Sequence, residues 1–139
     1  MILSMTKKTL ITFLYFFLLT CLPVQGRVLS TGTSEGQKFH VYEHISGLKI
    51  PWGMTFVSDQ LMLITEKSGN LKLLNLKNNQ LESVSNPPRI TQKGQGGLLD
   101  IRKDPTSDWI YTTYSLRTNR GIVTVLARGK LDGLRMKNW

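Results

Sequence analysis

The sequence predicts an all-β chain that is built from short antiparallel strands. Short runs rich in branched and aromatic residues follow one another, and tight-turn signals separate them. After the first 26 residues, no stretch of helical length keeps an apolar period of 3.6 residues. The 139 residues suffice for one domain, and a hydrophobic content of 40% with 9% aromatic residues suits a packed core.

The N-terminus has the features of an export signal. Two lysines precede an apolar run from Leu10 to Leu22, which is shorter than the roughly 20 residues that span a bilayer. Val24 and Gly26 supply the small residues expected before a signal-peptidase cut. We therefore predict a signal peptide over residues 1–26 and a secreted or periplasmic mature chain.

Two alternatives to simple secretion remain, a lipoprotein acylated at Cys21 and an uncleaved N-terminal anchor. Cleavage after residue 26 would remove the only cysteine and with it any disulfide or thiolate metal site. The net charge would fall from +9 to +7, and the remaining basic residues are scattered along the chain. We predict no nucleic-acid partner and, after cleavage, no membrane contact.

The mature chain is expected to begin with a flexible lead-in over residues 27–38, which is rich in Ser, Thr and Gly. Residues 39–139 are expected to form the folded part. Its turn signals are Ser58-Asp59, Ser68-Gly69, Asn78-Asn79 and Asp132-Gly133. Its expected strands are Phe39 to Ser46, Trp52 to Val57, Leu61 to Lys67, Asn70 to Lys77, Leu81 to Ser85, Gly97 to Arg102, Trp109 to Ser115 and Gly121 to Arg128.

The strands form two similar sets. The set beginning at Trp52 and the set beginning at Gly97 are offset by about 45 residues, which matches the period of a propeller blade. A β-sandwich has a similar strand spacing, so the pattern alone favours a propeller and a sandwich about equally.

Several segments resemble successive signatures of the glucose/sorbosone dehydrogenase family, in one order from His40 to Gly133. This family includes the soluble PQQ-dependent glucose dehydrogenase and the periplasmic aldose sugar dehydrogenases. The resemblance implies a partial six-bladed β-propeller of about two blades, with residues 39–139 as the N-terminal part. The matching segments are Pro51 to Phe56, Leu63 to Leu71, Gly94 to Ile101, Ile110 to Ser115 and Ala127 to Gly133.

The resemblance also implies a chemistry and a site. Family members hold PQQ, usually with calcium, and oxidise an aldose at its anomeric carbon with a histidine as general base. The family's catalytic histidine, the basic residues that bind the cofactor and the calcium ligands lie beyond this chain, so we predict no catalytic or metal-binding residue within it. Gln95 is the counterpart of the family's channel-facing glutamine, and its amide suits a sugar hydroxyl beside the quinone.

Each candidate residue also has a plainer interpretation. Gln95 suits a turn before an inner strand, and Gly94 to Gly97 lacks the third spaced glycine of a phosphate cradle. His40 and His44 would lie about 13 Å apart along one strand, too far to chelate one ion. Packing between blades is expected, rather than sugar stacking, for the aromatic residues Trp52, Trp109, Tyr111 and Tyr114.

Three functions remain in play, because a six-bladed propeller needs roughly 270 residues and signal removal leaves 113 of the 139. The first is the N-terminal portion of a periplasmic PQQ-dependent sugar dehydrogenase, truncated and inactive alone. The second is a secreted, non-enzymatic β module that binds carbohydrate or a partner chain. The third is a split enzyme, in which a second chain supplies the missing blades. We expect the first.

Overall fold

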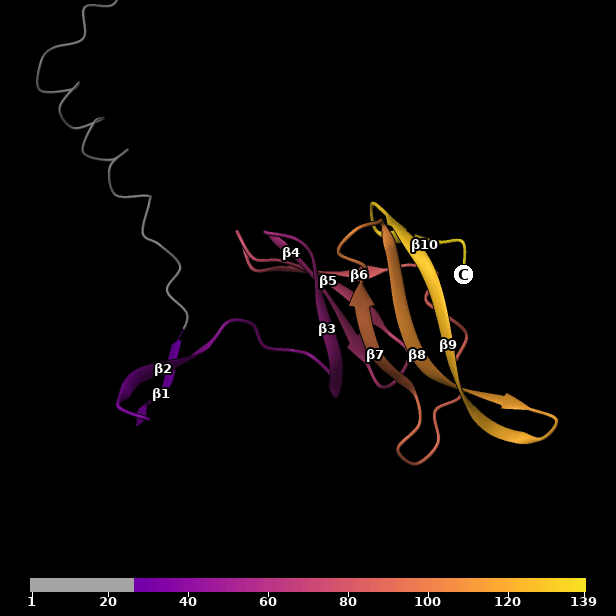
Figure 1. Cartoon of the computed structure of the whole chain (residues 1–139), viewed down its shortest axis with the longest axis horizontal. Helices are drawn as coiled ribbons and strands as arrows, with labels where there is room; N and C mark the ends of the chain where they lie inside the picture. Colours follow the sequence, from indigo (N-terminus) through magenta and orange to yellow (C-terminus); the bar gives the residue numbers. More distant parts are fainter. Residues whose placement is uncertain (1–26) are drawn as a thin grey trace, which may run out of the picture. The chain divides into compact units, whose positions relative to one another are not determined.

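The computed structural model describes residues 27–139, which fall into two compact units that divide between His44 and Ile45. The predicted signal peptide and the alternative acylation site at Cys21 lie outside the described residues. All regular secondary structure from residue 27 onward is strand, which confirms the all-β prediction (Figure 1). The described part of the chain contains no helix of the length and apolarity needed to cross a membrane.

The first unit contains a β-hairpin where a flexible lead-in was expected over residues 27–38. Strand β1 (Arg27–Ser34) pairs antiparallel with β2 (Gln37–Glu43). Glu35 and Gly36 form the two-residue turn, and both have positive φ values of 49° and 76°. A turn with two such residues matches the twist of the flanking strands, so backbone pairing orders a segment that has little apolar surface to bury.

The second unit contains two four-stranded antiparallel sheets, in each of which every strand pairs with its neighbour in the sequence (Figure 1). We call them the first and the second blade. The first blade consists of β3 (Pro51–Ser58), β4 (Leu61–Glu66), β5 (Leu71–Asn75) and β6 (Gln80–Val84). The second blade consists of β7 (Leu98–Lys103), β8 (Trp109–Thr118), β9 (Gly121–Asp132) and β10 (Arg135–Lys137).

The two blades repeat one plan. Strands β3 and β7 begin 47 residues apart, close to the offset of about 45 that the sequence predicts. Each of them has a register irregularity near its start, between Pro51 and Met54 in one blade and between Leu98 and Ile101 in the other. The short outer strand β10 has no counterpart among the expected strands.

The apolar core lies between the blades. Leu63 and Met136 are fully buried in it, and Ile101 and Ile110 are almost so. The side chains of this cluster come from both sheets, so the facing sides of the blades bury each other's apolar surface. The buried members of the cluster are Leu63, Leu71, Leu73, Val84, Ile101, Ile110 and Met136.

Two threonine hydroxyls join the inner strands β3 and β7. The buried Thr65 Oγ1 accepts the Gly53 N–H at 2.9 Å and lies 2.6 Å from the Leu99 carbonyl oxygen, to which its hydroxyl donates. Thr55 Oγ1 accepts the Lys103 N–H at 3.0 Å. These bonds give partners to backbone groups of the inner strands and tie the first blade to the second.

We expect Thr65→Val to weaken the contact between the blades. Valine keeps the shape of threonine but leaves the partly buried Gly53 N–H and Leu99 carbonyl without this partner, which costs about 1 to 3 kcal/mol of unfolding free energy. Urea denaturation of the full chain measures the loss. The matched control is Thr124→Val on the exposed part of β9, where we expect a change within about 0.5 kcal/mol.

The loop between β7 and β8 holds a carboxylate whose pKa is shifted. The backbone N–H and the hydroxyl of Thr106 each donate to Asp104 Oδ1 at 2.8 Å. These hydrogen bonds, the backbone one first, lower the pKa of Asp104 below its ordinary value of 3.8. A lowered pKa stabilises the folded chain above pH 3.8, and this contribution is lost as the pH falls through the lowered value.

Thr106→Val is expected to raise the pKa of Asp104 part of the way to its ordinary value, because the variant removes the hydroxyl donor and keeps the backbone donor. NMR titration of the Asp104 carboxyl carbon measures this change. The unsubstituted chain, titrated under the same conditions, is the control. An unchanged titration of Asp104 would show that the hydroxyl bond contributes nothing to the shift.

Candidate functional site

Gln95 lies in a tight turn that leads into β7. The Gly96 N–H donates to the Lys93 carbonyl at 2.9 Å, which closes the turn, and Gly94 has a φ of 57°. The side chain of Gln95 is exposed. The turn presents the Gln95 amide to solvent at the start of the inner strand of the second blade.

The two glycines after Gln95 let this turn pack closely against residues of both blades. A Cβ atom on Gly97 would lie 2.1 Å from the Lys67 carbonyl oxygen, and one on Gly96 would lie 2.6 Å from Ser115 Oγ. The Leu98 N–H donates to the same Lys67 carbonyl at 3.1 Å, and the Ser115 N–H donates to the Gly97 carbonyl at 2.9 Å. Gly97 is therefore needed for the close approach of its backbone to that of Lys67, and Gly96 for the close approach of the Ser115 side chain.

Glu66, the residue before Lys67, is a buried acid at the end of β4 that the sequence analysis did not single out. Only 1% of Glu66 is exposed, and its carboxylate accepts the Lys49 N–H at 2.6 Å and the Asn70 side-chain amide at 2.8 Å. The sequence signal that could have found it is an acid directly after the apolar run of β4, which is buried on both faces. A carboxylate in such a strand needs internal hydrogen bonds.

Trp52 and Trp109 were expected to pack between the blades, and neither belongs to the core cluster there. Trp52 is 46% exposed on β3, on the side of the first blade that the second blade does not cover, and Phe56 is 58% exposed there. Trp109 lies under two cations of β9, with Arg128 4.3 Å and Lys130 4.9 Å from its ring centroid. Neither tryptophan lies in the turn of Gln95.

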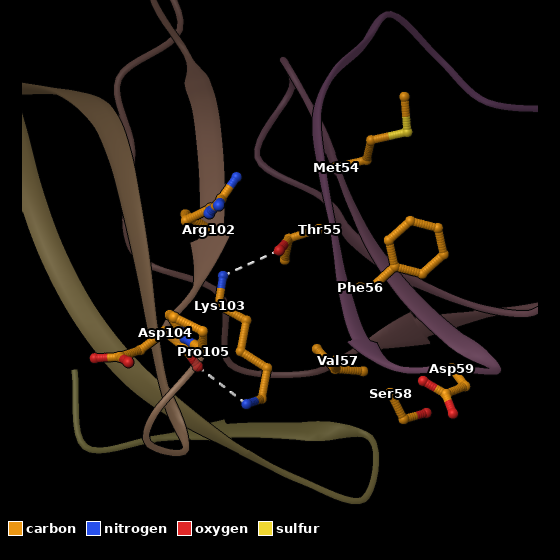
Figure 2. A pocket seen from close by; sticks show the side chains of 10 residues that line it. All are labelled: Met54, Thr55, Phe56, Val57, Ser58, Asp59, Arg102, Lys103, Asp104 and Pro105. Atoms are coloured by element: carbon orange, nitrogen blue, oxygen red, sulfur yellow. Dashed lines mark hydrogen bonds between the residues drawn. The ribbon is translucent and has the colours of Figure 1, made fainter.

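A hollow of about 650 Å³ lies at the C-terminal ends of β3 and β7, away from Gln95 (Figure 2). The Lys103 ammonium turns back to donate to the carbonyls of Asp104 and Ser107, at 3.1 and 3.0 Å. Within residues 27–139, no buried side-chain polar atom is left without a hydrogen-bond partner. The hollow therefore contains no buried polar group that is poised for a ligand.

Comparison with known proteins identifies the family of the chain. The family model described as glucose/sorbosone dehydrogenase matches residues 48–139, which include both blades and the turn of Gln95. The chain belongs to the glucose/sorbosone dehydrogenase family. This result confirms the resemblance seen in the sequence and supports the propeller rather than the sandwich.

Solved structures of the glucose/sorbosone dehydrogenase type share the fold. The soluble aldose sugar dehydrogenase from Escherichia coli, in its apo form, is 31% identical with a TM-score of 0.59 over 64% of this chain. The PQQ-bound aldose sugar dehydrogenase from Streptomyces coelicolor is 21% identical with a TM-score of 0.60 over 83% of this chain, a likeness of fold. The protein slr1608 of Synechocystis, which is described as uncharacterised, is 31% identical over 68% of this chain.

The chain spans only part of each of these proteins. It covers 28% of the Escherichia coli structure, 33% of the Streptomyces coelicolor structure and 26% of the Synechocystis protein. The two blades described above are therefore a fragment of the family's propeller.

The described residues contain no cluster of metal ligands. From residue 27 to residue 139, no three His, Cys, Asp or Glu side chains lie close enough together to hold a metal ion such as calcium. His40 lies exposed on β2, and His44 follows the end of that strand. Two lysines lie near Gln95: Lys93 is in the same turn, and Lys67 Cγ would lie 2.9 Å from a Cβ atom on Gly97. Gln95 remains the candidate residue for contact with a sugar.

Proposed function

We propose that this chain is the N-terminal portion of a periplasmic, PQQ-dependent sugar dehydrogenase that oxidises aldoses at the anomeric carbon. The family match over residues 48–139 and the PQQ-bound relative support this proposal. PQQ and calcium would be held by parts of the propeller outside the two blades, and the quinone would supply the hydride acceptor. We expect these 139 residues to be inactive by themselves, because they cover only 28% and 33% of the two solved aldose sugar dehydrogenases.

The contribution of this chain to the reaction is to bind the sugar. Gln95 is exposed at the start of β7, and its amide can donate one hydrogen bond and accept another. Two neighbouring hydroxyls of an aldose present such an acceptor and donor. The amide then orients the sugar without exchanging a proton with it.

The test uses the full chain alone and the full chain co-expressed with the part of the Escherichia coli aldose sugar dehydrogenase that it does not cover. With PQQ, calcium, an aldose and a dye acceptor, we expect no dye reduction by the chain alone and turnover by the complemented enzyme. Turnover by the chain alone would refute the proposal that it is inactive. A complemented enzyme that assembles and binds PQQ yet oxidises no aldose would refute the family activity for this chain.

Substitution of Gln95 tests its role in that complemented enzyme. We expect Gln95→Ala to lower kcat/KM about fivefold through KM, because one neutral hydrogen bond is worth about 1 kcal/mol. Gln92→Ala is the matched control, since Gln92 is an exposed glutamine three residues earlier in the same loop. Equal effects of the two variants would show that Gln95 is only a turn residue.

One observation favours the alternative in which a second chain supplies the missing blades of a split enzyme. The uncovered side of β3 exposes three large apolar side chains, Trp52, Met54 and Phe56, and Met54 is 69% exposed. A monomer rarely leaves such a continuous apolar face in water. Co-purification of the tagged chain with a second propeller-like chain from its own organism would support the split form of the enzyme.

A further inference from the structure

Glu66 is a buried carboxylate without a cation beside it. Within residues 27–139 the salt bridge that forms is the exposed pair Lys137 and Asp132, so the partners of Glu66 are neutral donors, the Lys49 N–H and the Asn70 side-chain amide. Burial of a charge is costly unless hydrogen bonds compensate for it. The role of Glu66 therefore lies in the two segments that its hydrogen bonds hold in place.

One of these bonds holds a strained segment of backbone. Ile50 has a φ of 51°, a left-handed conformation that is rare for a β-branched residue and costs of order 1 to 3 kcal/mol. Ile50 is 62% exposed, so side-chain packing does not impose the strain. Hydrogen bonds on both sides of the strained residue impose it: the Lys49 N–H donates to Glu66, and the Lys67 N–H donates to the Ile50 carbonyl at 3.0 Å.

The other bond fixes the turn that follows β4. Asn70 donates its side-chain amide to Glu66 Oε2, while the Glu66 N–H donates to the Asn70 carbonyl at 2.9 Å and the Gly69 N–H donates to the Glu66 carbonyl at 2.9 Å. Lys67 lies between these anchored residues. Its N–H and its carbonyl therefore have fixed directions.

The loop of Gln95 packs against the Lys67 carbonyl. It accepts the Leu98 N–H at 3.1 Å, and it lies so close to Gly97 that no side chain fits there. Gln95 is two residues before this contact. A displacement of Lys67 would therefore move the Gln95 turn.

We propose that Glu66 is a positioning residue for Gln95: its buried carboxylate clamps the Lys49–Ile50 segment and the turn at Asn70, and so holds the Lys67 carbonyl under the Gly97–Leu98 backbone. The link to catalysis rests on the proposed function, in which Gln95 binds the aldose. The positioning itself is a property of this chain and can be measured without any sugar.

The first experiment measures amide hydrogen exchange in the full chain. Glu66→Gln keeps an acceptor for the Lys49 N–H but sets an amide donor against the Asn70 amide, and we expect the Lys49 and Leu98 amides to exchange at least tenfold faster. The double variant Glu66→Gln with Asn70→Asp reverses donor and acceptor across this bond and should restore slow exchange. Unchanged exchange of the Leu98 amide in Glu66→Gln would overturn the positioning role.

The second experiment measures kinetics in the complemented enzyme with PQQ and an aldose. Glu66→Gln is expected to raise KM about as much as Gln95→Ala, and to add nothing in the Gln95→Ala background, because it acts through Gln95. Ile110→Val, a buried change in the core between the blades, is the control for lost stability and should leave KM unchanged. An additive effect of Glu66→Gln in the Gln95→Ala background would overturn action through Gln95.

The two experiments distinguish the positioning role of Glu66 from the sugar-binding role of Gln95. Faster exchange at Leu98 together with a normal KM for Gln95→Ala would support the positioning of the loop and refute the sugar-binding role of Gln95. Normal exchange at Leu98 with a raised KM for Gln95→Ala would refute the positioning role and support the proposed function. Slow exchange of the Leu98 amide together with a normal KM in the Glu66→Gln, Asn70→Asp double variant would support both the positioning role of Glu66 and the sugar-binding role of Gln95.

Discussion

Gly97→Ala is expected to be among the most damaging single substitutions in the second unit. The new methyl group would lie 2.1 Å from the carbonyl oxygen and 3.1 Å from the carbonyl carbon of Lys67. Backbone atoms cannot turn aside as the end of a flexible side chain can, so β4 and β7 would have to separate. We expect a loss of about 3 kcal/mol or more in unfolding free energy, measured by urea denaturation of the full chain.

The control for this substitution is Gly94→Ala, three residues earlier in the same loop. Gly94 has a positive φ, but a Cβ atom there would have no neighbour within 4 Å. The cost is then that of a left-handed alanine alone, about 1 to 2 kcal/mol. Equal losses for the two variants would show that conformation, and not contact with Lys67, explains the glycine at position 97.

Leu63→Ala is expected to lower the unfolding free energy by about 2 to 5 kcal/mol, the range found when a buried leucine is replaced by alanine. Leu63 is fully buried at the centre of the cluster between the blades, so the substitution would leave a cavity that neither sheet can fill. Chemical denaturation with two probes, tryptophan fluorescence and far-UV circular dichroism, would also show whether both blades unfold together.

Leu126→Ala is the matched control, because the same side chain is 67% exposed on β9. We expect a change within about 0.5 kcal/mol. A loss at Leu126 as large as that at Leu63 would mean that the uncovered side of the second blade is buried in solution.

Local sequence patterns predict the strands of the two blades well, because each run of branched residues ends at a turn that the chain itself encodes. Strand β10 is different. It pairs with β9, but its three residues include only one buried side chain, Met136. Contacts with the segment after β6 also hold it: the Met136 N–H donates to the Ser85 carbonyl at 3.0 Å, and the Ser85 N–H donates to the Leu134 carbonyl at 2.8 Å. Contacts across about 50 residues leave no local signal.

The candidate site could be predicted only in part for a similar reason. The glycines around Gln95 indicate a turn, and the structure has one there. What the turn rests on, the Lys67 carbonyl, is a backbone atom from another strand, and no side-chain pattern reports such a contact. Glu66 escapes notice because β4 is buried on both faces, so the alternation that separates inside from outside is missing.

The strictly sequential strand order of both blades has a kinetic consequence. In each blade, every strand after the first pairs with the strand just before it in the chain. Such short-range pairing gives a low contact order and lets hairpins close within microseconds. We therefore expect each sheet to form as it leaves the ribosome, and the docking of the two sheets through Leu63, Ile110 and Met136 to limit the rate of folding.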